Sequence, residues 1–122
     1  MKTDRTEATA VEAVVRDYID GWYAGDEERM DRTLHDELVK RSVDAEGDPP
    51  GALVPVSKTR MVQLTRDGGG HSPGAKADVV VHHVEATIAS AMVETSEFLD
   101  YVHLARTDGT WRIVHDLFRQ RT

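Results

Sequence analysis

The sequence predicts a single α+β domain in which N-terminal helices pack in a curved antiparallel β-sheet. Two observations support this prediction. Apolar residues near the start of the chain have helical spacing, whereas those near the end alternate as in strands joined by hairpins. Helices followed by a run of strands are typical of α+β domains. A length of 122 residues suits one domain over residues 1–122.

The first helix is predicted from an apolar stripe that occupies one helical face. Its members are Val11, Val14, Val15, Tyr18, Ile19 and Trp22. Gly25 suits the left-handed residue that ends a helix, and Asp26 can cap a second helix that carries Met30. The stripe needs a partner surface, so we expect the first helix to lie in the hollow of the sheet.

The remaining elements follow from turn signals and alternation. We expect a short strand over 38–43, a loop over 44–56, a helix over 57–64 capped by Ser57, and a flexible break over 66–74. The predicted strands are 79–84, 88–93, 98–106 and 111–119. Asp108-Gly109 is a strong hairpin signal between the last two strands.

Composition argues against several functions. A net charge of −7 disfavours nucleic acid and anionic membranes as partners. There is no cysteine, no apolar run of about 20 residues and no signal-peptide core near the first residues, so we expect a cytoplasmic protein. His82 and His83 are adjacent on a strand and point to opposite faces, and the other histidines lack ligand spacing. No metal site and no cofactor is therefore expected.

The last hairpin allows its two faces to be predicted. A two-residue loop at Asp108-Gly109 pairs Thr107 with Thr110, and uninterrupted pairing then sorts the side chains by face. The face expected inside carries Asp100, Val102, Leu104, Arg106, Trp111, Ile113, His115 and Leu117. The face expected outside carries Leu99, Tyr101, His103, Ala105, Arg112, Val114, Asp116 and Phe118.

This register makes Asp100 and His115 diagonal neighbours. A carboxylate beside an imidazole fixes its tautomer, as a general acid or base requires, so His115 and Asp100 are candidate catalytic residues. Two other interpretations stay open: a structural polar pair, and a pair that hydrogen-bonds a ligand. A three-residue loop would instead place the two side chains on opposite faces.

The pocket is expected between the first helix and the inner sheet face. Its candidate lining residues are Tyr18, Trp22, Val102, Leu104, Trp111 and Ile113. The two tryptophans could stack on a flat ring. The alternative is that both are ordinary core residues.

Four segments together resemble a known family. They are Tyr18–Asp26, Leu34-His35, Asp100-Tyr101 and Asp108–Val114. The chain resembles the nuclear-transport-factor-2-like superfamily from about Val11 to Arg119, and within it the bacterial putative lumazine-binding group.

The resemblance implies a cystatin-like cone, in which the sheet wraps around the first helix, and a homodimer formed through the outer sheet face. It also implies an internal pocket. Tyr18 matches the oxyanion-hole tyrosine of the ketosteroid isomerase branch, whose active sites tune the pKa values of their acids. The general base of that branch falls near Arg41, which cannot accept a proton, so that chemistry is not expected. Asp100 is a candidate for the second oxyanion residue.

Three functions follow as hypotheses. The favoured hypothesis is a domain that binds a small molecule, a flat heterocycle, in an apolar pocket. The second is a small lyase or isomerase that uses the Asp100–His115 pair. The third is a dimerisation module with no ligand.

Overall fold

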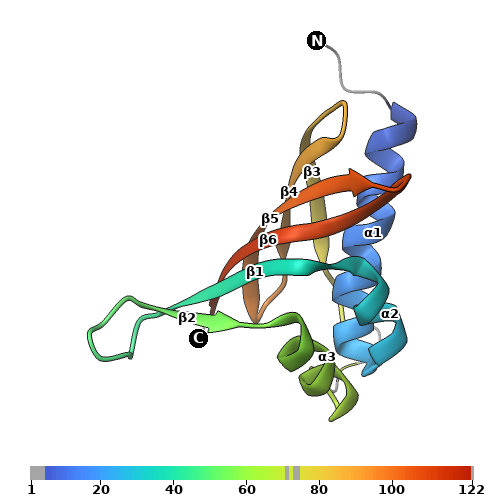
Figure 1. Ribbon diagram of the computed structural model, residues 1–122. Coiled ribbons are helices and arrows are strands. Elements are labelled where there is room, and N and C mark those ends of the chain that lie inside the picture. The colour runs from blue at the N-terminus through green and yellow to red at the C-terminus, as the bar shows by residue number, and fades with distance from the viewer. Residues whose placement is uncertain (1–4, 71, 73–74, 122) are drawn as a thin grey trace.

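The fold is a curved sheet with helices on its concave side. The computed structural model describes residues 5–70, 72 and 75–121. The elements in chain order are α1 (Arg5–Ala24), α2 (Glu27–Thr33), β1 (Leu34–Asp44), β2 (Ala52–Val56), α3 (Lys58–Arg66), β3 (Asp78–Glu85), β4 (Ile88–Glu94), β5 (Phe98–Thr107) and β6 (Thr110–Gln120). Over these residues the strands form one six-stranded sheet in the order β2-β1-β6-β5-β4-β3 (Figure 1).

The strand directions are antiparallel with one exception. Neighbouring strands pair antiparallel throughout, except that β1 runs parallel to β6. No helix in the described ranges is both long and apolar enough to cross a membrane. The α+β architecture predicted from the sequence is confirmed.

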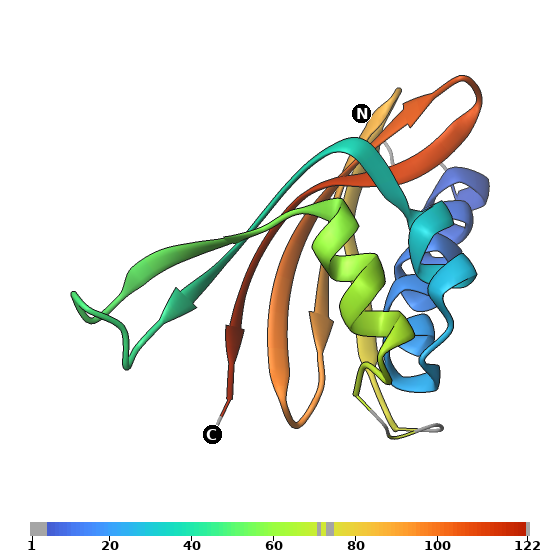
Figure 2. The same ribbon diagram turned by 60° about the horizontal axis from the view of Figure 1, so that its bottom comes forward.

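Helix α1 lies against the sheet along its apolar stripe. It packs on β3, β4 and β6, and Figure 2 shows the helices gathered on the concave side. Val11, Val15, Tyr18 and Ile19 are all 3% exposed or less, so the stripe is the helix's contribution to the core. Burial of about 1.5–3 kcal/mol per large apolar side chain makes this face the main reason the helix docks.

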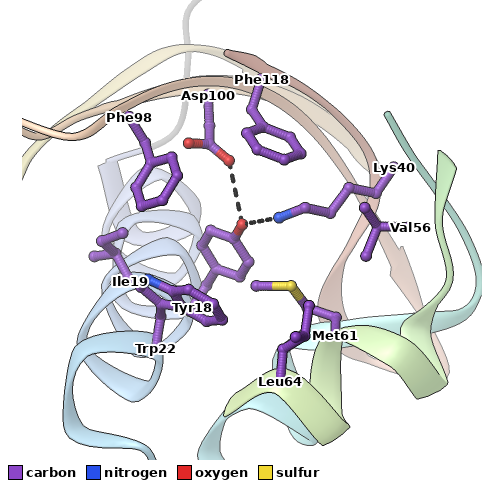
Figure 3. A pocket seen from close by; sticks show the side chains of 10 residues that line it. All are labelled: Tyr18, Ile19, Trp22, Lys40, Val56, Met61, Leu64, Phe98, Asp100 and Phe118. Atoms are coloured by element: carbon purple, nitrogen blue, oxygen red, sulfur yellow. Dashed lines mark hydrogen bonds between the residues drawn. The ribbon is translucent and has the colours of Figure 1, made fainter. Parts of the chain in front are cut away.

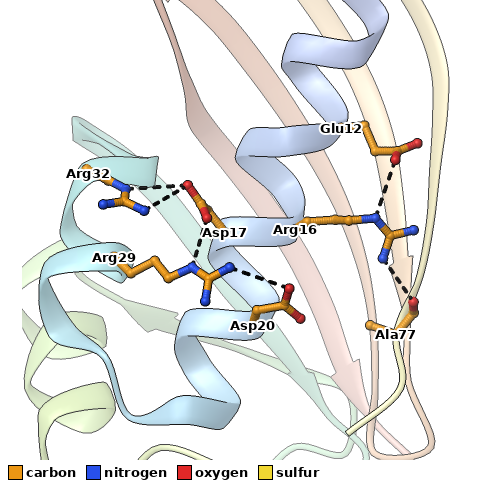
Figure 4. Close-up of polar contacts among 7 residues, drawn as sticks. All are labelled: Glu12, Arg16, Asp17, Asp20, Arg29, Arg32 and Ala77. Atoms are coloured by element: carbon orange, nitrogen blue, oxygen red, sulfur yellow. Dashed lines mark hydrogen bonds and ion pairs between the residues drawn. The ribbon is translucent and has the colours of Figure 1, made fainter. Parts of the chain in front are cut away.

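A tight corner joins α1 to α2 as predicted. Gly25 has φ +69°, and the Asp26 carboxylate accepts a hydrogen bond of 3.1 Å from the Arg29 backbone N–H. Figure 4 shows how ion pairs close the corner: Asp17 accepts from Arg29 Nε at 2.8 Å and from Arg32 Nη2 at 3.2 Å. The corner therefore fixes the angle at which the chain enters β1.

The region before α3 differs from the prediction. Strand β1 is longer than expected at both ends, and residues 52–56, predicted as loop, form β2. A loop is predicted there because this stretch is rich in proline and glycine, and Pro55 lies within it. Proline is excluded from central strands but is tolerated at an edge, and β2 is an edge strand. The predicted break over 66–74 is described only in part, since residues 71, 73 and 74 lie outside the described residues.

The β5–β6 hairpin begins in the predicted register and then leaves it. Thr107 pairs with Thr110 and Leu104 with Ile113, but His103 pairs with His115. Val114 is thus an extra residue, a β-bulge.

The bulge reverses the faces of the last part of β6. Beyond it, Asp116 and Phe118 turn inward, while His115 and Leu117 turn outward. The predicted faces of these four residues are wrong because a shift of one residue sends every following side chain to the opposite face.

Candidate functional site

An apolar cavity of about 140 Å³ lies between α1, α3 and the inner sheet face (Figure 3). Its apolar wall consists of Ile19, Trp22, Val56, Met61, Leu64, Phe98 and Phe118. The Trp22 and Phe98 rings meet edge to face at 6.3 Å, as do Phe98 and Phe118 at 6.1 Å. Aromatic edges and faces are therefore available to a ring-shaped ligand.

Polar side chains close the inner end of the cavity. Tyr18 Oη lies 3.2 Å from Asp100 Oδ2 and 3.0 Å from Asp116 Oδ2, and Lys40 Nζ donates a hydrogen bond to it. Lys40 Nζ is also 3.1 Å from Asp116 Oδ2. All four residues are 4% exposed or less. Of the four, Tyr18, Lys40 and Asp100 line the cavity itself. We call these four residues the polar cluster.

Burial raises the pKa values of two members of the polar cluster, Asp100 and Tyr18. Desolvation and the nearby Asp116 charge raise the pKa of Asp100 well above the ordinary carboxyl value, although Lys40 opposes the shift. Desolvation and the two aspartates raise the pKa of the Tyr18 phenol. Burial therefore favours the neutral forms of Asp100 and Tyr18, while Lys40 forms an ion pair with Asp116.

One buried oxygen of the cluster has no hydrogen-bond donor in the described part of the chain. Asp116 Oδ1 is buried and has no hydrogen-bond partner among the described residues. Asp100 and Asp116 are diagonal neighbours, since Asp100 pairs with Phe118 and Val102 pairs with Asp116. A hydrogen on Asp100 can satisfy that oxygen, and a carboxyl–carboxyl hydrogen bond is one cause of the raised pKa of Asp100.

The predicted pair of Asp100 and His115 is not formed. Asp100 is 2% exposed on the inner face, whereas His115 lies exposed on the outer face and contacts His103. The loop has the two residues that were expected; the bulge at Val114 separates the two side chains. Asp116 takes the place predicted for His115.

The two tryptophans do not converge. Trp111 Nε1 donates a hydrogen bond of 2.6 Å to Glu7 at the beginning of α1, whereas Trp22 lies near its end. With 1.5 Å of rise per residue, these two levels of the helix are about 22 Å apart. Tyr18 and Trp22 line the cavity; Val102, Leu104, Trp111 and Ile113 are buried in the core and are not among its lining residues.

Sequence reasoning missed Lys40, Asp116 and the phenylalanine pair. Lys40 stands beside Arg41 in a strand with cations on both faces, and no local pattern tells which cation is buried. Asp116 and Phe118 follow a bulge that no glycine or proline marks. Arg41, the position matched to the isomerase base, is exposed and does not line the cavity.

Solved structures of low sequence identity share this fold. An NTF2-like protein of unknown function from Silicibacter pomeroyi DSS-3 is 22% identical, with a TM-score of 0.82, over 98% of this chain and 100% of its own. Another, from Shewanella baltica OS155, is 19% identical, with a TM-score of 0.79, over 100% and 99%. A ketosteroid isomerase-like protein from Erwinia carotovora atroseptica SCRI1043 is 12% identical, with a TM-score of 0.70, over 98% and 99%.

The helix-lined curved sheet is that of the NTF2-like, cystatin-like class. Within this class, the profile of the family described as "Putative lumazine-binding" matches residues 6–119. The chain belongs to this family. No match is found among curated proteins.

Proposed function

We propose that this protein binds a small molecule in the cavity beneath α3. One observation carries the proposal: an apolar cavity ends in three buried polar side chains, those of Tyr18, Lys40 and Asp100. Ligand sites commonly combine apolar walls with a few convergent polar groups. The family's description, which names lumazine binding, supports the same reading.

The cavity volume limits the ligand to about one ring. A protein cavity of about 150 Å³ admits benzene, and this one measures about 140 Å³. A bicyclic pteridine would place one ring inside and the other between half-buried Val56 and Leu64. The enclosed ring would lie against Trp22 and Phe98.

The polar cluster sets the expected polarity of the enclosed ring. Lys40 and Asp116 pair with one another, and the Tyr18 hydroxyl donates to aspartate oxygens within the cluster. An acceptor on the ligand would compete with these aspartate oxygens for the hydrogens of Tyr18 and Asp100. The matching ligand carries an uncharged acceptor, such as a ring carbonyl, at its inner edge.

Tryptophan fluorescence tests the site with lumazine as the probe. We expect lumazine to quench the fluorescence of the protein and of Trp111→Phe, the matched control outside the cavity. Quenching should vanish in Trp22→Phe. The proposal fails if lumazine does not quench and neither phenol nor benzene raises the melting temperature of the wild type.

Acid–base catalysis is a second candidate function. It is favoured by the raised pKa of Asp100 beside Tyr18, because a neutral acid can donate to a carbonyl oxygen as charge develops there, while water or hydroxide from solvent takes the α-hydrogen. Deuterium exchange of the α-hydrogens of cyclopentanone, followed by NMR, tests it. Exchange no faster than in Tyr18→Phe and Asp100→Asn would reject catalysis of this kind.

We further propose that the chain forms homodimers through the outer sheet face. A row of apolar residues crosses that face in register: Val80, Met92, Tyr101 and Leu117. Val80, Tyr101 and Leu117 are 44%, 51% and 47% exposed, and such contiguous apolar surface favours association. Sedimentation should show a dimer for the wild type and for Thr59→Lys on the exposed side of α3, but a monomer for Leu117→Lys. A monomeric wild type would contradict this proposal.

A further inference from the structure

A row of polar residues crosses the outer sheet face beside the apolar row. His83 pairs with Ser90, Ser90 with His103, and His103 with His115, so adjacent strands β3 to β6 each contribute one residue. Residues paired directly across strands share a face. The three histidines are exposed and line a shallow concavity of about 410 Å³.

Two of these histidines already contact one another through ring nitrogens. His103 Nδ1 and His115 Nδ1 are 3.2 Å apart, with ring centroids at 5.5 Å and an interplanar angle of 73°. The hydrogen that lies between the two Nδ1 atoms can move to the Nε2 atom of the same ring. In that tautomer both Nδ1 atoms carry a lone pair. Both nitrogens can then face a common cation.

The separation of the two nitrogens matches a chelate. Late transition metals bind imidazole nitrogen at about 2.0–2.1 Å, so two ligands are about 3.3–3.4 Å apart in tetrahedral geometry and about 2.8–3.0 Å apart in a square plane. The observed 3.2 Å lies between these values. The strands therefore hold the two Nδ1 atoms near the distance that a chelate requires, without rearrangement of the backbone.

We propose that His103 and His115 chelate a late first-row divalent ion, such as Ni²⁺, Cu²⁺ or Zn²⁺, through their Nδ1 atoms. Imidazole suits these ions. Glu85 lines the same concavity and contributes negative charge. Across the described ranges, no three histidine, cysteine or carboxylate side chains gather as a metal site. The pair supplies two ligands, and water completes the coordination.

The sequence alone led us to expect no metal site, and the proposed chelate departs from that expectation. His103 and His115 are separated along the chain by a hairpin, and uninterrupted pairing would place them on opposite faces. The bulge at Val114 brings them together, and it is the same feature that turns Asp116 into the cavity.

Calorimetric titration with Ni²⁺ tests the chelate. We expect one ion per chain for the wild type and for His82→Ala, a control that removes a neighbouring exposed histidine outside the row. His103→Ala and His115→Ala should each weaken binding by at least the roughly 10- to 100-fold that loss of an outer-shell partner costs. Equal affinity in all four proteins would overturn the proposal.

A spectroscopic experiment distinguishes the two-histidine chelate from adventitious metal binding. It also shows whether the chelate depends on dimer formation. With Cu²⁺, paramagnetic resonance should show coupling to two nitrogens in the wild type, and no such pair in His115→Ala. The Leu117→Lys variant should retain the two-nitrogen signal, because both ligands come from one chain. Loss of the signal in this variant, or its appearance there alone, would overturn the chelate without bearing on the cavity proposal.

Discussion

Lys40 is a charged side chain whose environment is almost wholly protein. It is 4% exposed, pairs with Asp116, and lies over the rings of Tyr18 and Phe118 at 4.9 and 4.5 Å. Removing one member of a buried ion pair leaves the other charge without compensation, which is far more costly than removing an exposed cation.

Lys40→Met should therefore lower the free energy of unfolding by about 3–5 kcal/mol. The matched control is Arg41→Met on the next, exposed position, where the change should stay within about 0.5 kcal/mol. The double variant Lys40→Met, Asp116→Leu should recover much of the loss, because neither charge remains. Urea denaturation measures all three variants; equal effects for the two single variants would contradict the buried-pair assignment.

Asp100 makes the free energy of unfolding depend on pH, and its raised pKa determines the direction of that dependence. Because burial raises its pKa, the folded protein keeps a proton that the unfolded chain releases near its ordinary pKa of about 4. Its contribution to stability is thus complete below that pH and falls as the pH rises towards the folded-state pKa.

Asp100→Asn should remove this fall, since the amide stays neutral and can still donate to Asp116. We expect the variant to match the wild type near pH 4 and to exceed it at pH 8 by about 1–3 kcal/mol, the cost of a poorly compensated buried polar group. The control is Asp78→Asn, the same change at an exposed position. Denaturant titrations at both pH values measure the effect; a variant less stable than the wild type at pH 8 would refute the neutral assignment.

Among the elements, α3 and the end of β6 decide the shape of the site. Helix α3 contributes Met61 and Leu64 to the cavity wall, and Ser57 caps its first turn by accepting from the Arg60 N–H at 3.0 Å. A helix of nine residues depends on such a cap, because short helices are marginal by themselves.

Ser57→Ala should cost about 1 kcal/mol of unfolding free energy through loss of the cap. It should also weaken lumazine quenching of Trp22, because the frayed helix no longer holds the wall in place. Thr59→Ala, an exposed change within the same turn, is the control. A Ser57 variant with unchanged stability would show that packing alone holds the first turn.

At the scale of the whole molecule, the sheet separates two surfaces with different chemistry. The concave side carries the cavity and the polar cluster, while the convex side carries the apolar row and the histidine pair. Trp111, Glu7 and Arg106 close the opposite end of α1, with Arg106 Nη1 2.9 Å from the Glu7 carboxylate. The proposed ligand site and the proposed dimer surface therefore lie on opposite sides of the sheet and do not overlap.

Association should make thermal stability depend on concentration. If dimers form through the outer face, mass action raises the melting temperature of the wild type as protein concentration increases. The melting temperature of Leu117→Lys should not change with concentration. Differential scanning calorimetry over a wide range of concentrations tests this, and a wild type without concentration dependence would argue for a monomer.

The sequence by itself determined the three helices, the last hairpin and the apolar face of the first helix. The stripe from Val11 to Trp22, the caps at Asp26 and Ser57, and the Asp108-Gly109 turn are local signals, and they predict α1, α2, α3 and the last hairpin. The described structure has these elements. Periodicity and capping suffice here because both act within a few residues.

Only the tertiary structure decided which polar groups meet. The bulge at Val114 has no local signature, since residues 111–118 can alternate in either register, yet it determines whether Asp116 or His115 faces inward. The burial of Lys40 rather than Arg41 depends on the pairing of β1 with β6, which are far apart in the chain. Face assignment is a property of strand pairing, so a one-residue shift fixed by distant contacts changes the site while leaving the fold intact.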